Sequence, residues 1–310
     1  MPSSRAEATA ATLRAPVPSP VREALLRAGR RARGLTGSLL VLPGAFWLIL
    51  FFFVPLGYIA VYSVATNVDF AVVRFGFDLQ NFSDALSTPG LVSAIVRAAL
   101  YAGLAALLDL VIAYPLAYWI VRRGGRYKNF LVVLIILPFF SSYLIRVFAW
   151  VSVLRNEGVI NTALQGAGLI SSPIEFLGTP FAVVLVLAYD FLPFMILPLY
   201  VALERLDPAL LEASKDLGGT KLATFWRVTW PLSMPGVVAG MLLVFVPALG
   251  DFVTPELVGG LNTQVIGQNV YRQFLSFQNY PLGSALAFIL MAISLLAAIV
   301  ITRVLGREAT

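Results

Sequence analysis

The sequence contains no cysteine and no histidine among its 310 residues. Disulfide scaffolds, thiol nucleophiles, imidazole bases and the usual zinc sites are therefore excluded. Charge is also scarce, because Asp, Glu, Lys and Arg make up only 12% of the chain, whereas a soluble domain has about 25%. Apolar residues account for 59% of the chain, and its mean hydropathy is +0.86. This composition excludes a soluble enzyme, a secreted disulfide-rich domain and a disordered protein.

Six long apolar runs follow one another along the chain. Each reaches the ~20 residues that a helix needs to cross the hydrocarbon core of a bilayer. We therefore expect an all-α polytopic membrane protein with six transmembrane helices. The runs cover residues 39–64, 91–120, 130–153, 180–203, 231–253 and 282–302.

Basic residues are distributed unevenly between the two sides of such a topology. If the N-terminus is inside, seventeen of the 22 Lys and Arg residues fall on that side, and only Arg74, Arg155 and Arg272 fall on the other. Cytoplasmic loops carry the excess of Lys and Arg in membrane proteins. We therefore expect both termini to be cytoplasmic. The excess of basic residues on the cytoplasmic side then explains the net charge of +6, and no nucleic-acid partner is needed to account for it.

The same pattern predicts three parts of the chain. Residues 1–38 are rich in Ala, Pro, Ser and Arg and are expected to form a flexible basic cytoplasmic tail. Residues 39–303 form the six-helix transmembrane domain, which lies in membrane lipid and contains a long cytoplasmic loop at 204–230. Residues 304–310 form a short cytoplasmic C-terminal tail.

The loop at 204–230 has the clearest local signals. Asp207 is a good N-cap, Pro208 suits the first position of a helix, and Gly218 is a typical helix stop. Thr220 predicts the cap of a second short helix, whose inner stripe is expected to be Leu222, Phe225, Trp226 and Thr229, before Pro231 opens the next span. Two amphipathic pieces of this kind suit docking into a groove of a soluble partner. An ordinary interfacial loop is the alternative on these features alone.

The spacing of this loop resembles the EAA signature of ABC importer permeases. The sequence has Glu212-Ala213-Ser214, three residues, Gly218, nine residues, and Val228-Thr229-Trp230-Pro231. Ser214, Val228 and Trp230 depart from the commonest residues but keep their size class. The resemblance implies a type I ABC importer permease fold in which Glu212, Ala213 and Gly218 form the ATPase-coupling element. It also implies an ABC ATPase dimer as partner, which binds the ATP and Mg²⁺, with no cofactor in this subunit.

Three further stretches resemble the longer permease subunit of spermidine/putrescine-type importers. They are residues 42–55, 146–161 and 247–260. This resemblance implies a bacterial inner-membrane subunit that pairs with a second homologous permease, or a second copy, and receives polyamines from an extracytoplasmic solute-binding protein. An alternative is that the same kind of importer carries another solute, such as an opine, an amino-acid-like compound or ferric iron. A secondary transporter driven by an ion gradient and a non-transporting scaffold are further alternatives.

Residues that could bind a nucleotide phosphate are missing. Gly218-Gly219-Thr220-Lys221 has the wrong order and spacing for a phosphate-binding loop, and there is no pairing of a nucleophile with a base. We therefore expect a transport subunit, not an enzyme, whose energy comes from a separate ATPase.

Ionisable residues inside the spans are few, and each is a functional candidate. A polycation in transit needs carboxylates for charge and aromatic faces for cation–π contact. The candidate translocation path therefore comprises Asp190, Tyr189, Asp109, Asp251, Trp47 and Trp150. In the alternative interpretation, Asp190 pairs with Arg146, Arg97 reaches the interface, and the aromatic residues only anchor the spans.

Overall fold

The computed structural model describes residues 42–70 and 72–306, and the chain divides into two units, Met1–Ile59 and Ala60–Thr310. The predicted basic tail at 1–38 lies outside the described residues, as do residues 307–310. Most of the apolar helix Leu42–Ser63 belongs to the first unit. This helix includes the π-helical segment η1 (Ile49–Phe53), and it ends with α3 (Val54–Ser63). Its side chains are largely exposed within this chain, as expected for a helix surrounded by lipid or by another subunit.

Within the second unit, a small extramembrane segment precedes the bundle. Strands β1 (Thr66–Asp69) and β2 (Val72–Arg74) form an antiparallel hairpin, and α4 (Gln80–Ser87) follows. The side-chain amide of Asn81 donates hydrogen bonds to the carbonyl oxygens of Ser63, at 3.1 Å, and Ala65, at 2.7 Å. This side chain therefore ties α4 to the end of α3.

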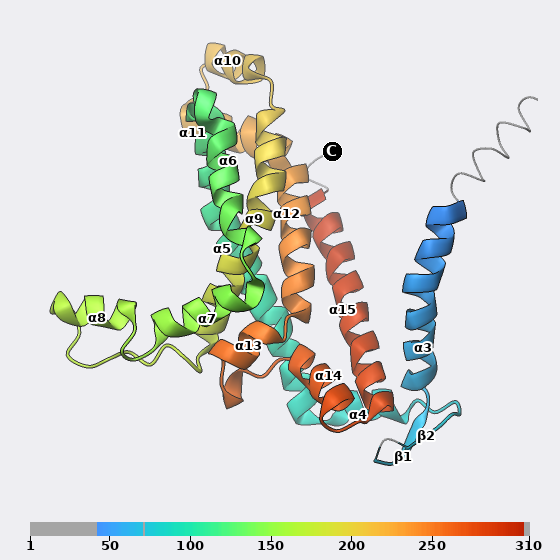
Figure 1. Cartoon of the computed structure of the whole chain (residues 1–310). Coiled ribbons are helices and arrows are strands. Elements are labelled where there is room, and N and C mark those ends of the chain that lie inside the picture. Colours follow the sequence, from blue (N-terminus) through green and yellow to red (C-terminus); the bar gives the residue numbers. More distant parts are fainter. Residues whose placement is uncertain (1–41, 71, 307–310) are drawn as a thin grey trace, which may run out of the picture. The chain divides into compact units, whose positions relative to one another are not determined.

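Four long helices form the bundle of the second unit (Figure 1). They are α5 (Pro89–Arg123), α9 (Pro180–Glu204), α12 (Trp230–Gly250) and α15 (Tyr280–Gly306). Helices α5, α9 and α12 pack against one another, and α15 packs against α12. Buried alanines on α5 allow this close approach, since small residues let membrane helices come together. Helix α15 continues past the predicted end of the sixth run at 302.

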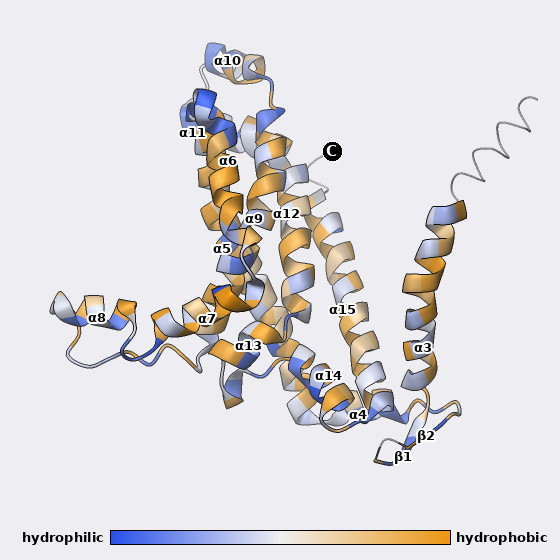
Figure 2. Cartoon of the chain, viewed as in Figure 1, coloured by the Kyte–Doolittle hydropathy of each residue, from blue (hydrophilic) through white to orange (hydrophobic). Residues whose placement is uncertain are grey.

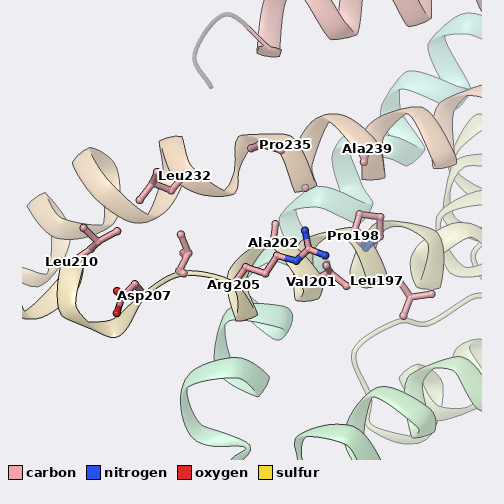
Figure 3. Close-up of a pocket in the computed structure, with 12 residues that line it drawn as sticks. Leu197, Pro198, Val201, Ala202, Arg205, Asp207, Leu210, Leu232, Pro235 and Ala239 are labelled. Carbon is pink, nitrogen blue, oxygen red and sulfur yellow. The ribbon is translucent and has the colours of Figure 1, made fainter. Parts of the chain in front are cut away.

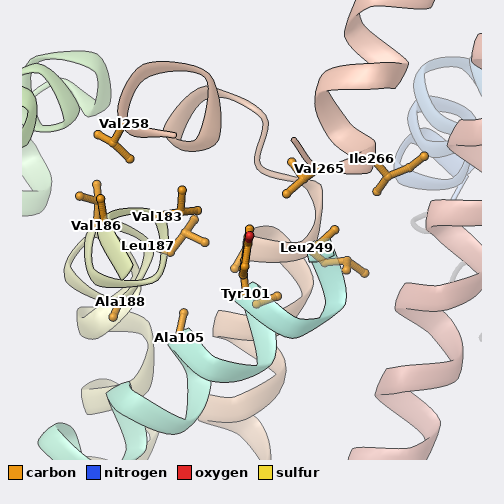
Figure 4. Close-up of a cluster of buried hydrophobic side chains, with 14 of the residues drawn as sticks. Tyr101, Ala105, Val183, Val186, Leu187, Ala188, Leu249, Val258, Val265 and Ile266 are labelled. Atoms are coloured by element: carbon orange, nitrogen blue, oxygen red, sulfur yellow. The ribbon is translucent and has the colours of Figure 1, made fainter. Parts of the chain in front are cut away.

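The buried apolar side chains form two clusters. One brings together Tyr101 and Ala105 of α5 with Val183 and Leu187 of α9, and Figure 4 shows these side chains facing one another. The other lies further along the same helices and includes Met195, Leu199 and Met234. Gly240 of α12 belongs to this tight contact, because a Cβ there would lie 2.6 Å from the sulfur of Met195.

The third apolar run does not form one straight helix. The segment comprises η2 (Gly125–Tyr127), α6 (Lys128–Ile136), η3 (Leu137–Phe140), α7 (Tyr143–Leu154) and, after a turn, α8 (Val159–Gly166). It bends by 89° between Phe140 and Tyr143. The described residues thus contain five helices long enough to span a bilayer, or six if the bent pair counts as one. Ser141 and Ser142 are extended, so the helix cannot continue through them.

Short helices complete the two ends of this bundle. The loop after α9 holds α10 (Pro208–Asp216) and α11 (Lys221–Thr224), and the π-helical η4 (Phe225–Thr229) leads into α12. After α12 come α13 (Val253–Val258), η5 (Leu261–Thr263) and α14 (Ile266–Leu275). Helix α10 lies at the same end as the last turn of α15, and α4 and α14 lie at the other end (Figure 1). Figure 2 shows apolar residues along the long helices and polar residues on α10 and α11.

Candidate functional site

Arg146 is the centre of a polar cluster at the bend between η3 and α7. Its Nη1 donates to the carbonyl oxygens of Ser141, at 2.8 Å, Phe139, at 3.2 Å, and Pro138, at 3.3 Å. The helix breaks here, and backbone groups at membrane depth must be satisfied within the protein. The Pro138 carbonyl also accepts the backbone N–H of Ser141 at 3.1 Å. The side chain of Arg146 is only 8% exposed, so its positive charge interacts with groups inside the fold and hardly with solvent.

Asp190 of α9 balances this buried charge. The Nε of Arg146 donates to Asp190 Oδ1 at 2.8 Å, and the side chain of Asp190 is 1% exposed. The pairing given as an alternative from the sequence is therefore confirmed. The second oxygen, Oδ2, has no hydrogen-bond partner among the described residues. Asp190 thus keeps one free acceptor although its other oxygen is paired.

This ion pair lines a cavity of about 410 Å³. Asp251 and Tyr143 contribute to the same wall, and the Tyr143 hydroxyl donates to Asp251 Oδ2 at 2.6 Å. The other oxygen of Asp251 accepts the backbone N–H of Val253 at 2.9 Å, at the start of α13. The cavity therefore contains two carboxylates and one guanidinium, a formal excess of one negative charge. Its remaining lining residues are Ser141, Phe139, Phe191, Phe194 and Pro247.

Two predicted aromatic residues lie next to this cluster. The rings of Trp150 and Tyr189 meet edge to face with their centres 5.3 Å apart. Tyr189 also lines a smaller cavity of about 190 Å³, to which Arg146 and Asp190 contribute. The fold therefore brings Asp190, Asp251, Tyr189 and Trp150 into one neighbourhood, although they come from three separate runs of the sequence.

The other two predicted path residues are placed differently. Asp109 of α5 is 0% exposed, and neither of its carboxylate oxygens has a partner among the described residues. It is not one of the residues that line the 410 Å³ cavity. Trp47 belongs to the first unit, where its side chain is 65% exposed and its ring lies 4.3 Å from that of Phe51.

The predicted coupling loop forms its first helix as expected. Helix α10 begins at Pro208, and Asp207 caps it because its Oδ1 accepts the N–H of Ala209 at 2.9 Å. Glu212 and Ala213 lie on this helix and are exposed. The chain then turns at Gly218, whose φ of +78° lies in the left-handed region that favours glycine. The turn is closed by the N–H of Gly219, which donates to the Ser214 carbonyl at 2.9 Å.

The second half of the loop differs from the predicted stripe. Thr220 caps α11 as predicted, with Oγ1 accepting the N–H of Ala223 at 3.2 Å. Thr229 is buried as predicted and Phe225 packs against the second buried cluster, but Leu222 and Trp226 are 68% and 56% exposed. Thr224, which was not predicted, is also buried, and its hydroxyl bonds to that of Ser214 at 2.9 Å. Pro231 does not open a separate span, since α11, η4 and α12 run on as one helix over Lys221–Gly250. The N–H of Trp230 donates a π-helical hydrogen bond to the Phe225 carbonyl, so the helix is continuous up to Pro231.

Two features join this loop to the membrane helices. Lys128 of α6 forms an ion pair with Glu204 at the end of α9, directly before the loop. An apolar groove of about 710 Å³ lies between α9 and α12, and Leu210 at the start of α10 reaches its edge (Figure 3). Close packing of the two helices forms its floor, because a Cβ on Gly236 would lie 2.5 Å from the Cβ of Ala202.

Part of the polar cluster was not predicted from the sequence. Tyr143 was not predicted, although it holds Asp251, and neither was the contact of Arg146 with the carbonyls of the bend. The available signal was Pro138 followed by Ser141-Ser142 inside an apolar run, because proline and short polar residues interrupt helices. Together they mark a break at which an arginine nearby would find free carbonyls.

Comparison with known proteins finds a matching family and similar permease proteins. The family described as "Binding-protein-dependent transport system inner membrane component" matches residues 33–308. The spermidine/putrescine transport system permease protein PotB of Haemophilus influenzae is 37% identical over 250 residues, which cover 80% of this chain and 87% of that protein. PotB of Escherichia coli is 39% identical over 239 residues, which cover 77% of this chain and 86% of that protein.

A solved structure has the same fold. It is a bacterial alginate ABC transporter in complex with an alginate pentasaccharide-bound periplasmic protein, with a TM-score of 0.73 and 20% identity. The alignment covers 90% of this chain and 96% of the chain in that structure. At this identity the likeness concerns the fold alone, which is that of a type I ABC importer permease.

Proposed function

This chain belongs to the family of binding-protein-dependent transport system inner membrane components, and on that premise we propose that it conducts polyamines such as spermidine and putrescine as the permease subunit of an ATP-driven importer. Because the family and the relatives are membrane components of transport systems, the chain is a multi-pass transport subunit of the inner membrane and not an enzyme. The polyamine assignment is carried by the 37% and 39% identity to two spermidine/putrescine permeases over most of each chain.

The solute path passes the polar cluster at the bend. Asp190 and Asp251 supply the negative charge that a polycation requires, and Tyr189 and Trp150 supply aromatic faces. Asp109 and Trp47 belong to the same proposed path. Since Asp109 is fully buried, it contacts solute only when the packing of α5 against its neighbours opens.

The end of the bundle that carries α10 faces the cytoplasm. The loops 122–128 and 205–227 and the end of α15 lie there and carry most of the Lys and Arg residues that the structure describes, which supports this orientation (Figure 1). With the bent pair counted as one span, the domain at 39–303 has six spans and both termini are cytoplasmic. Residues 1–38 and 304–310 are then cytoplasmic tails.

An ABC ATPase dimer docks on the coupling loop and binds the ATP and Mg²⁺. Leu217 is 90% exposed beside Gly218, and Leu222 and Trp226 are also exposed, so the loop presents apolar side chains that nothing in the described chain covers. Glu212 adds a charge to this surface. Closure of the ATPases would move α10, and α9 would transmit that movement to the bend.

Two further protein partners complete the importer. A second permease, homologous or identical, forms the other half of the path, and the apolar groove between α9 and α12 suits a helix of that subunit. An extracytoplasmic solute-binding protein delivers the solute, as the periplasmic protein bound to the related alginate transporter suggests. Membrane lipid surrounds the remaining apolar surface, and no nucleic acid is involved.

The test is solute-stimulated ATP hydrolysis by the complete complex in proteoliposomes, with a panel of polyamines, opines, amino acids and ferric iron. We expect spermidine and putrescine to stimulate hydrolysis and to accumulate inside. Stimulation by a different solute alone would refute the polyamine assignment and leave the permease assignment intact. Uptake that continues without ATP would instead support transport driven by an ion gradient.

A further inference from the structure

Five aromatic side chains form a cluster where the loop at 204–230 meets the membrane helices. They belong to α5, to η4 and to the first turn of α12, and they are Tyr114, Tyr118, Phe225, Trp226 and Trp230. The ring of Phe225 meets two rings of α5 edge to face, with centres 5.6 Å from that of Tyr114 and 6.3 Å from that of Tyr118. Edge-to-face pairs at such distances are favourable beyond the area that they bury. The second half of the loop is therefore attached to α5 through this aromatic cluster.

A buried chain of hydrogen bonds strengthens the same junction. The Ser233 hydroxyl donates to the Trp230 carbonyl at 2.9 Å. Because its hydrogen is used there, Ser233 Oγ accepts from the Tyr114 hydroxyl, which lies 2.7 Å away. Tyr114 is 6% exposed and Ser233 is fully buried, so water does not compete for this bond. Tyr114 thus joins α5 to the first turn of α12, directly after η4.

Both elements are interrupted at the point where they meet. Pro115 follows Tyr114 inside α5 and has no N–H to donate to the carbonyl of Val111. Phe225 contacts Tyr114 before this proline and Tyr118 after it. On the other side of the contact, η4 is π-helical, a form that is rare and occurs mostly at functional sites. Prolines and π-helical turns are where helices bend, so both partners can change shape at this junction.

We propose that Tyr114 is a positioning residue for transport, which transmits the movement of the loop at 204–230 to α5. This inference rests on the proposed ATP-driven import, and it adds a route through α5 to the route through α9. When the ATPases displace α10 and α11, η4 moves with them. Tyr114 is held by Ser233 and Phe225, so it carries α5 along, and the helix bends at Pro115. Asp109 lies on the same helix, and this movement therefore loosens the packing that buries it.

Tyr101 provides a matched control on the same helix. It is 6% exposed, as Tyr114 is, but it belongs to the other buried cluster, with Val183 and Leu187 of α9. Replacement of either tyrosine by phenylalanine keeps the ring and removes only the hydroxyl. A difference between the two variants therefore reports the bond from Tyr114 to Ser233, and not the general effect of losing a buried hydroxyl.

The experiment measures solute uptake and ATP hydrolysis together, with the complete complex and the binding protein in proteoliposomes. Tyr114→Phe should lower the solute imported per ATP about fivefold, a size that the loss of one hydrogen bond can produce. The KM for solute and the amount of assembled complex should stay at their wild-type values. Ser233→Ala should have a similar effect, and the double variant should be no worse, because both changes remove the same bond. Tyr101→Phe should match the wild type.

A second measurement follows the movement of α5 directly. The sequence contains no cysteine, so Leu110→Cys places a single thiol in this chain, next to Asp109. The rate at which a water-soluble maleimide labels this subunit should differ between the nucleotide-free complex and the complex trapped with ATP and vanadate. Adding Tyr114→Phe should remove most of that difference, whereas adding Tyr101→Phe should leave it intact.

The proposal is overturned if Tyr114→Phe imports as much solute per ATP as Tyr101→Phe, or if its labelling responds to nucleotide as strongly as that of the wild type. A lower amount of assembled complex with unchanged import per ATP would also overturn it, because Tyr114 would then serve only the fold. Uptake by the wild-type complex without ATP would instead refute the proposed function, so the two failures are distinguishable.

Discussion

The bend around Arg146 and the loop at 204–230 are built in opposite ways. At the bend, charged groups are buried and are mostly satisfied inside the chain, by an ion pair and three carbonyls. In the loop, polar backbone groups are satisfied by local caps, but large apolar side chains are exposed, with Leu217 90% exposed. The first region satisfies most of its charges within the chain, whereas the second exposes apolar side chains of the kind found at sites of protein interaction.

The two regions also differ in what a substitution should change. A buried ion pair contributes little net stability but is costly to break, because the remaining charge has no partner. An exposed loop contributes little to the fold of the bundle. Substitutions at the bend should therefore change solute handling, and substitutions in the loop should change coupling to ATP hydrolysis.

The largest effect is expected from Gly218→Asp. A side chain at φ +78° costs roughly 1 kcal/mol of backbone strain, and the carboxylate would enter the surface that docks on the ATPase. Solute-stimulated ATPase activity of the reconstituted complex should be lost, while the membrane subunits still assemble, because the helices of the bundle do not depend on this turn.

Gly168 supplies the matched control for that substitution. It also has a positive φ, +70°, and open space around it, but it lies in the segment after α8. Gly168→Asp should therefore keep normal stimulation. Normal stimulation in Gly218→Asp as well would show that the coupling element lies elsewhere.

A smaller effect is expected from Asp190→Asn at the bend. The amide oxygen can still accept the Arg146 Nε hydrogen bond, but the counter-charge and the free carboxylate oxygen are lost. Polyamine uptake per unit of assembled protein should fall about tenfold, which corresponds to ~1.4 kcal/mol, and protein abundance should fall less. Uptake measured in proteoliposomes with quantified complex tests this. If uptake stays unchanged, Asp190 serves only as the structural partner of Arg146.

The smallest effect is expected at the junction of the two regions, where Lys128 pairs with Glu204. Both side chains are more than a third exposed, and ion pairs in water contribute little to stability. Lys128→Glu should lower the amount of solute imported per ATP by a few fold, because α9 would be less firmly held to α6. The double variant Lys128→Glu with Glu204→Lys should restore the ratio. A double variant as impaired as the single one would argue against a role for this pair in coupling.

Much of the loop could be predicted because its signals are local. Asp207, Pro208 and Thr220 act on backbone groups within three residues of themselves, so their roles are readable without the fold. Half of the predicted inner stripe of the second helix, Leu222 and Trp226, was wrong for the complementary reason. Thr224 is buried with its hydroxyl bonded to that of Ser214, which lies across a turn. The exposure of Leu222 and Trp226 cannot be predicted from the periodic spacing of apolar residues alone.

The sequence by itself determined that this is an apolar helical membrane protein, which residues can carry charge inside the bilayer, and where the loop at 204–230 starts its first helix and turns. Composition, run length and helix caps are properties of neighbouring residues, so no tertiary information is needed for them. Only the tertiary structure decided that the third run bends by 89°, that Arg146 bonds to the carbonyls at that bend, and that Asp190 and Asp251 line one cavity. Those contacts join segments far apart in the chain, and burial at membrane depth, which requires each charge and carbonyl to find a partner, selects among the possible pairings.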